Sequence, residues 1–336
     1  MVLASLSAPR RRFTATAAGA LSCALVAVAC GSPSPTLPVA APAPVPTPMQ
    51  VRFVTIVSGE TSQPVSGAQV IVGGVESTSG ADGRATVPPD ARSSALVDIV
   101  AAGFLDRQTT YGRALASARF PLWPRTSPTG LDEKFTQEIV YTTFGEDATV
   151  GAAPMRRWRS SLGPVRVLLG KGFDPSAGRS VDNQVDAARQ MNDLLGDSLE
   201  YMEPVFSDEE PDAGVVVVKV DPDAETCDGN VLAFASFYVY TNGEIGKVDI
   251  VYCTVLETQR INIVRHEFGH SLGLRHSFEP SDLMYPYDTS DRFTERERLA
   301  VRLMYQRPTG NRYPDNDREA TASATWGRVE TVVCGS

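Results

Sequence analysis

The chain has 336 residues, of which 42% are hydrophobic, so it can bury a sizeable core in two domains. Its formal net charge of −9, with 31 Lys and Arg residues, argues against a nucleic-acid-binding surface.

The first 29 residues have the pattern of an export signal. Three consecutive arginines at 10–12 precede a stretch at 15–29 that is too short and too rich in alanine for a membrane span. Residues 27–31 (AVACG) resemble a bacterial lipobox, which implies cleavage before Cys30 and lipidation of its thiol. Ordinary secretory cleavage near Ala29 is the alternative. We therefore expect an exported protein, held at a membrane of the cell envelope by a lipid anchor or else secreted.

A linker and a small β domain are expected next. Residues 30–49 are rich in proline and carry no charge, which predicts an extended spacer. Between 50 and 124, short alternating strands are separated by turns such as Ser58-Gly59 and Asp82-Gly83, which predicts an antiparallel β-sandwich. The pattern is similar to the carboxypeptidase regulatory-like (transthyretin-like) domains. No residue here points to catalysis, so we expect a spacer or a binding role.

A second domain, of the α+β class, is expected at 131–310 after a linker at 125–130. Its predicted elements in chain order are a helix at 131–141, a strand at 165–169, a helix at 181–199, a strand at 215–220, hairpin strands at 231–240 and 248–253, and helices at 257–273 and 294–306. Thr294 and Glu297 form a capping box at the start of the last helix. Residues 311–336 are expected to be a polar, poorly ordered tail.

All three histidines of the chain lie in one motif, HEFGHSLGLRH, at 266–276. In a helix, His266 and His270 stand on one face and can reach a single metal ion, while Glu267 can take a proton from a metal-bound water. Gly273 allows the chain to turn back, which would bring His276 in as a third ligand. Three protein ligands leave one position open on Zn²⁺, as in a catalytic site.

A second signature, SDLMYP, follows at 281–286. With it, the sequence resembles the metzincin zinc peptidases, and most of all their matrixin branch. The resemblance implies a metzincin-like fold, one catalytic zinc, and Met284 in a Met-turn that forms a hydrophobic floor under the metal. Calcium is left open as a second cofactor.

The resemblance also implies a peptide or protein substrate that pairs antiparallel with an edge strand beside the cleft. Residues Ala233, Phe234 and Ala235 match that strand; an ordinary core strand is the alternative. The chain departs from the family in three ways. Residues 249–252 lack histidine, which excludes a histidine-bound structural zinc; no cysteine-switch motif precedes the catalytic domain; and Tyr287 directly follows Pro286, where matrixins usually insert one residue.

Three cysteines remain in the exported body. An oxidising compartment favours one disulfide and one leftover thiol. We favour Cys227–Cys253, because these residues bracket the predicted hairpin, and this pairing leaves Cys334 in the tail.

Together these features predict a monomeric, exported zinc endopeptidase with Glu267 as the general base. The alternative is a non-catalytic envelope lipoprotein with a structural zinc site and a partner-binding β-sandwich. A fourth protein ligand would favour the alternative, and the sequence offers no fourth histidine and no cysteine close to the motif.

Overall fold

The computed structural model describes residues 52–113, 118–140, 154–159, 163–209, 211–287, 290–318 and 326–335. The predicted export signal, Cys30 and the proline-rich linker lie outside these ranges. Among the described residues, none of the helices combines the length and the apolar character that crossing a membrane requires.

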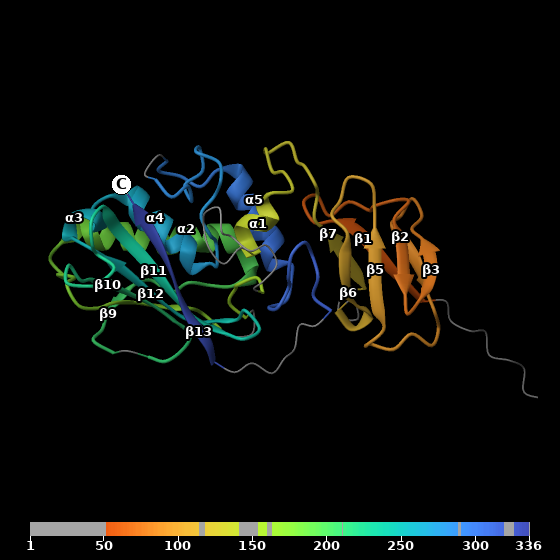
Figure 1. Ribbon diagram of the computed structural model, residues 1–336, viewed down its shortest axis with the longest axis horizontal. Coiled ribbons are helices and arrows are strands. Elements are labelled where there is room, and N and C mark those ends of the chain that lie inside the picture. Colours follow the sequence, from red (N-terminus) through yellow and green to blue (C-terminus); the bar gives the residue numbers. More distant parts are fainter. Residues whose placement is uncertain are drawn as a thin grey trace, which may run out of the picture. The chain divides into compact units, whose positions relative to one another are not determined.

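Residues 52–122 form two small sheets that enclose a common core (Figure 1). One sheet has the strand order β4-β1-β7 and the other β3-β2-β5-β6. The strands are β1 (Arg52–Ser58), β2 (Gln69–Val72), β3 (Val75–Thr78), β4 (Arg84–Val87), β5 (Leu96–Val100), β6 (Arg107–Thr110) and β7 (Arg119–Leu122). Alternate side chains point inward, as the sequence predicted. The sandwich is not purely antiparallel, because β1 and β7 run parallel.

The second part of the chain is built on a six-stranded mixed sheet with the order β13-β11-β12-β10-β8-β9. Its strands are β8 (Arg166–Leu169), β9 (Val205–Phe206), β10 (Val215–Val220), β11 (Val231–Tyr240), β12 (Ile245–Tyr252) and β13 (Trp326–Gly335). Strand β10 runs parallel to β8 and β12, whereas β11 runs antiparallel to both of its neighbours. The predicted α+β class is correct.

Helices complete the domain. They are α1 (Phe135–Val140), α2 (Gly178–Leu195), α3 (Val255–Thr258), α4 (Ile261–Ser271) and α5 (Glu295–Tyr305). Helices α2 and α4 pack against each other, and α4 also contacts β11. The single helix predicted at 257–273 is instead two helices, with Gln259 and Arg260 between them. Helix α5 has the predicted capping box, with reciprocal bonds between Thr294 and Glu297.

The C-terminal residues correct two predictions. Residues 326–335 are not part of a poorly ordered tail, because they form β13 and pair antiparallel with β11 along its length. Strand β11 therefore lies inside the sheet, and its predicted role as an open edge is wrong for this form of the protein. Residues 311–318 are also structured and bond to β6, through Gln108 to Asp315 and Asp317.

Candidate active site

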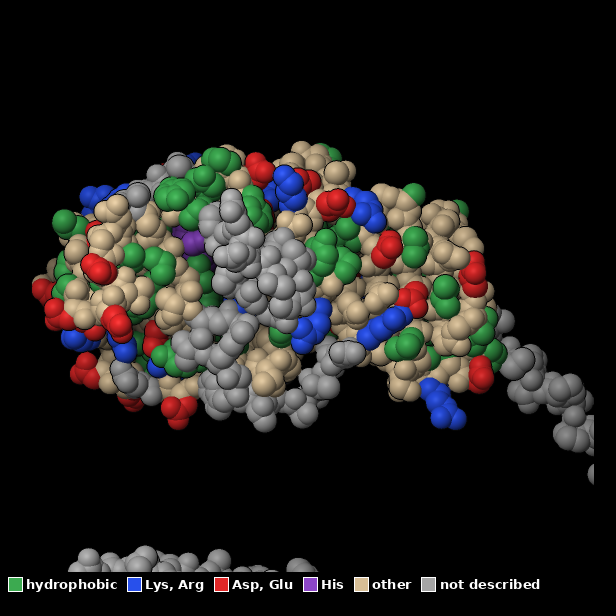
Figure 2. Space-filling model, viewed as in Figure 1, with side chains coloured by type: hydrophobic (Ala, Val, Ile, Leu, Met, Phe, Trp, Pro, Cys, Tyr) green, Lys and Arg blue, Asp and Glu red, His purple; other side chains and the backbone are tan. Residues whose placement is uncertain are grey.

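Helix α4 places His266, Glu267 and His270 together inside the domain. They are 3%, 0% and 0% exposed. The apolar side chains of Ile263, Val264 and Phe268 are equally buried, so the sequence leaves little of this helix facing solvent. Figure 2 accordingly shows histidine as one small area of the surface.

The third histidine arrives through a turn at the end of α4. Gly273 has φ of 99°, and a Cβ there would lie 2.1 Å from the carbonyl oxygen of Arg156. Conformation and space both require glycine at this position. The turn brings His276 back, so that one ligand atom from each of His266, His270 and His276 lies within 4.8 Å of the others. The three predicted metal ligands therefore converge.

Hydrogen bonds to backbone carbonyls orient two of these rings. His266 Nδ1 lies 2.7 Å from the oxygen of Leu283, and His270 Nδ1 lies 2.9 Å from the oxygen of Leu274. A nitrogen that donates to a carbonyl carries the proton, so Nε2 presents a lone pair. Within the described part of the chain, neither Nε2 has a hydrogen-bond partner. These two buried acceptors, together with the third converging imidazole of His276, fit a tetrahedral Zn²⁺ ion.

Burial sets the protonation of the site. It lowers the pKa of His266 to about 4, and with the charges of His266 and Arg275 it lowers that of His276 to about 3. The pKa of His270 is also well below its usual value, first through burial. All three rings are thus neutral near pH 7, the form that binds a metal. Burial raises the pKa of Glu267 well above its usual value, and a neighbouring divalent cation would oppose that shift.

Met284 lies directly against the active-site helix, where the Met-turn was predicted. It is 1% exposed, and a Cβ added at Gly269 would come within 2.4 Å of its sulfur. The glycine between the two helical ligands is therefore needed for the close approach of this methionine.

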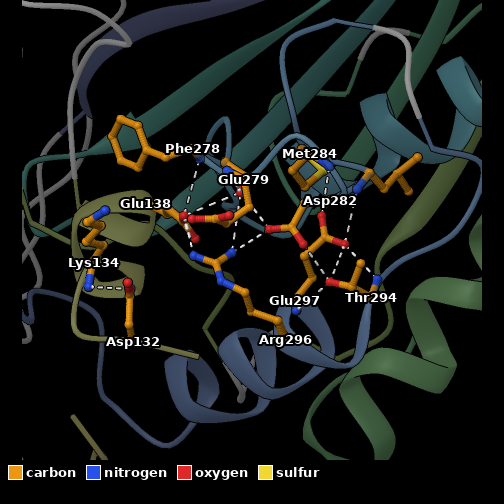
Figure 3. Close-up of polar contacts among 12 residues, drawn as sticks. Asp132, Lys134, Glu138, Phe278, Glu279, Asp282, Met284, Thr294, Arg296 and Glu297 are labelled. Carbon is orange, nitrogen blue, oxygen red and sulfur yellow. Dashed lines mark hydrogen bonds and ion pairs between the residues drawn. The ribbon is translucent and has the colours of Figure 1, made fainter. Parts of the chain in front are cut away.

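A buried polar network holds the Met-turn (Figure 3). The Glu297 carboxylate accepts hydrogen bonds from the backbone N–H groups of Leu283 and Met284, at 3.2 and 2.8 Å. The carbonyl of Leu283 lies in turn against His266 Nδ1. Glu297 thus acts on His266 through one peptide unit. The sequence identified its capping role and missed this second one.

Arg296 joins the same network from α5. Its guanidinium forms ion pairs with Glu138 of α1 and with Asp282 of the Met-turn. Ser277 donates a 2.6 Å hydrogen bond to Asp282, directly after the third histidine. All four side chains are buried. Nothing local in the sequence identifies these partners, because Glu138 and Arg296 are 158 residues apart.

Three aromatic side chains hold the C-terminal end of α4. Trp158 Nε1 donates to the carbonyl of Ser271 at 2.8 Å, and Tyr201 Oη donates to the same oxygen at 3.0 Å. Tyr305 Oη donates to the carbonyl of Leu272 at 3.0 Å. These groups satisfy carbonyls that the helix end leaves without partners, just before the turn to His276. The sequence carried no signal for them.

The predicted edge-strand residues and the predicted disulfide lie outside α4 and the Met-turn. Ala233, Phe234 and Ala235 are buried in β11, between β12 and β13. Cys227 and Cys253 are joined in a disulfide.

Cys334 is the residue whose position the sequence did not reveal. Its thiol is free and buried, and its sulfur lies within 4.8 Å of ligand atoms of both His266 and Glu267. The expectation that no cysteine is available near the motif is therefore wrong. Pairing of β13 with β11 brings Cys334 to the site, and this long-range pairing cannot be seen in the spacing of the sequence.

Comparison with known proteins gives a family for part of the chain. A search of curated proteins found no match. Among solved structures, a metalloproteinase-II from Bacteroides fragilis aligns with 76% of this chain and 85% of its own, at 15% identity and a TM-score of 0.31. Residues 164–303 match the family model of the M10 peptidases, described as matrixin. This segment contains the three histidines, Glu267 and Met284. Residues 164–303 are therefore a matrixin-like metzincin metallopeptidase domain.

Proposed function

We propose that the protein is a zinc-dependent endopeptidase with Glu267 as its general base. One observation carries the proposal: three neutral imidazoles converge beside a buried carboxylate that has no hydrogen-bond partner among the described residues. An ordinary core would not retain such a group without a partner. A metal and its water would satisfy all of these atoms.

The roles of the residues follow from this geometry. His266, His270 and His276 would hold Zn²⁺, which lowers the pKa of a bound water toward about 7 and polarises a carbonyl. Glu267 takes the proton of the attacking water and returns it to the leaving amine. The neutral histidines keep the ligand set uncharged, so the positive charge of the metal remains available to the substrate.

A structural zinc site is the second candidate, and Cys334 is the observation that favours it. The Cys334 sulfur lies within 4.8 Å of ligand atoms of His266 and Glu267. A thiolate that joined the three histidines would close the tetrahedron, as in a structural site. In that case Glu267 has no role in proton transfer. The two candidates therefore differ in whether the protein cleaves peptides.

The test is cleavage of a broad peptide library, read by mass spectrometry. Wild type and Cys334→Ala are assayed together, since the thiol would compete with water for the metal. We expect internal peptide bonds to be cut by at least one of them, with loss of cleavage in a chelator and recovery on adding Zn²⁺. A chain that binds one zinc and cuts no peptide in either form would instead support the structural site.

We also propose that the protein acts outside the cytoplasm on a lipid anchor at Cys30. The export signal, the lipobox-like sequence and the proline-rich spacer support this location, and a disulfide suits an oxidising compartment. The wild type should partition into detergent, whereas Cys30→Ser should stay in the aqueous phase. A free, unmodified thiol at Cys30, found by mass spectrometry, would contradict the anchor.

A further inference from the structure

Strand β13 occupies the position beside β11 that an extended peptide substrate would take. The two strands pair antiparallel, with Cys334 opposite Ala233 and Val332 opposite Ala235. Figure 1 shows β13 running alongside β11. The hydroxyls of Ser236 and Thr331 add a 2.9 Å hydrogen bond across the pair. The backbone groups of β11 that an added peptide strand would use are thus taken by the chain itself.

The end of β13 also contacts the segment that follows the Met-turn. Gly335 forms a parallel bridge with Tyr287, and its N–H donates to the carbonyl of Pro286 at 3.4 Å. The last residues of β13 therefore lie between two walls, β11 on one side and residues 286–287 on the other. These last residues have backbone contacts on both sides and lie beside the metal ligands. An edge strand would have a backbone partner on one side only, so they are bound in the way that a peptide is bound in a cleft.

Cys334 is the residue of β13 that reaches the site. Its side chain is 2% exposed, and its sulfur lies within 4.8 Å of ligand atoms of His266 and Glu267. A water activated by Glu267 must lie between that carboxylate and the metal. The sulfur lies close to this carboxylate and to one of the three imidazoles, and a thiolate is among the strongest protein ligands for Zn²⁺.

We propose that residues 326–335 are an internal occupant of the substrate cleft, and that the Cys334 thiolate is the fourth ligand of the metal, in place of the catalytic water. The protein described here is then the latent form of the peptidase. On binding, the thiol releases its proton to solvent, and it takes a proton back when water replaces it on the metal. This inference rests on the proposed peptidase function.

The first test is the spectrum of the full chain loaded with Co²⁺ in place of Zn²⁺. A thiolate ligand gives an intense near-ultraviolet charge-transfer band, which imidazole and water ligands lack. We expect the band in wild type and its loss in Cys334→Ala, with the visible cobalt bands retained because the three histidines remain. Val333→Ser is the matched control, since its side chain lies on the opposite, more exposed face of β13 and should leave the band unchanged.

The second test is peptide cleavage by the same three zinc-loaded proteins. If less than about a tenth of the wild type has an open cleft, Cys334→Ala should cleave at least about tenfold faster, and Val333→Ser should resemble wild type. Thermal melting shows that each variant is folded.

The outcomes distinguish the latent form from the peptidase function itself. A thiolate band together with faster cleavage by Cys334→Ala supports the latent form. Absence of the band, with equal cleavage by wild type and Cys334→Ala, overturns the inference and leaves the peptidase function intact. A band without cleavage by any variant overturns both and identifies a closed structural site.

Discussion

At the scale of single residues, backbone carbonyls rather than acidic side chains orient the two helical ligands. The carbonyl that positions His266 belongs to the Met-turn, and the one that positions His270 belongs to the turn after α4. Both rings therefore depend on the course of the chain immediately around the site. A neutral orienting group also leaves the imidazoles less basic than a carboxylate partner would.

The buried histidines predict how the metal-free protein responds to acid. Burial lowers the pKa of His266 from 6.5 to about 4, so the unfolded chain takes up a proton on acidification before the folded one does. Stability is then full above pH 6.5 and falls as the pH drops toward 4. His266 alone would account for about 3 kcal/mol. About 2 kcal/mol of this should be lost between pH 7 and pH 5, which urea unfolding of chelator-treated protein at the two pH values measures.

The matched control for the acid experiment is His266→Gln, which removes the titrating ring and retains a polar side chain. Its stability should fall less steeply between pH 7 and pH 5 than that of wild type. Identical slopes for the two proteins would show that His266 is already protonated, or already exposed, in the folded state.

At the scale of elements, helix α5 fixes the Met-turn, and Arg296 is the centre of that contact. It lies between Glu138 and Asp282, which are 6% and 1% exposed. Replacement by Met would leave two buried carboxylates without their cation. We expect a loss of about 3–5 kcal/mol in the free energy of unfolding, because breaking a buried pair leaves an uncompensated charge.

Arg298→Met is the control on the same helix. Its ion pair with Glu295 is largely solvent-exposed and should contribute less than about 1 kcal/mol. Chemical denaturation of both variants measures the two losses in the free energy of unfolding. Equal effects for the two arginines would mean that the buried network does not stabilise the Met-turn.

The elements that the sequence predicted well are those whose signals are local. The spacing of His266 and His270, the glycine at 273 and the capping box at Thr294 each depend on a few neighbouring residues, and each predicted its local structure correctly. The sequence also predicted that the three histidines converge, because Gly273 and His276 lie within five residues of the end of α4.

What the sequence did not predict depends on distant pairing. Residues 326–335 contain the β-branched run of a strand, but their partner β11 lies about 95 residues earlier. Local polarity suggested a tail, and only the pairing brings Cys334 to Glu267. The break between α3 and α4 was missed because no proline or glycine stands between Glu257 and Ile261 to mark it.

At the scale of the whole molecule, the β-sandwich and the catalytic domain share packing. Trp123, at the end of the sandwich, belongs to the same hydrophobic cluster as α4 and α5. Its Nε1 donates to the carbonyl of Leu303 at 3.0 Å, and Arg307 lies 4.4 Å from its ring centroid. Arg107 of β6 also forms a buried ion pair with Asp317. The core of the catalytic domain therefore extends to the end of the sandwich.

Trp123→Ala tests this continuity. Removing a fully buried Trp should cost about 3–5 kcal/mol, and the loss should appear in the unfolding of the catalytic domain as well as of the sandwich. Leu96→Ala, at a half-exposed position of the sandwich, is the control and should cost less than about 1 kcal/mol. In the variant, fluorescence of Trp158 follows the catalytic domain, and circular dichroism follows the whole chain. Unfolding of the sandwich alone, with the catalytic transition unchanged, would contradict a shared core.

The most direct test of the catalytic assignment compares zinc content and peptide cleavage in Glu267→Gln, made in the Cys334→Ala background so that no thiol competes with water for the metal. All three histidine ligands remain, so the variant should bind one zinc per chain and keep its fold. Its cleavage rate should fall by about 10²–10⁴-fold, because the group that transfers the proton is gone. A variant that binds zinc and cleaves as fast as its parent would contradict the role of Glu267 and the account built on it.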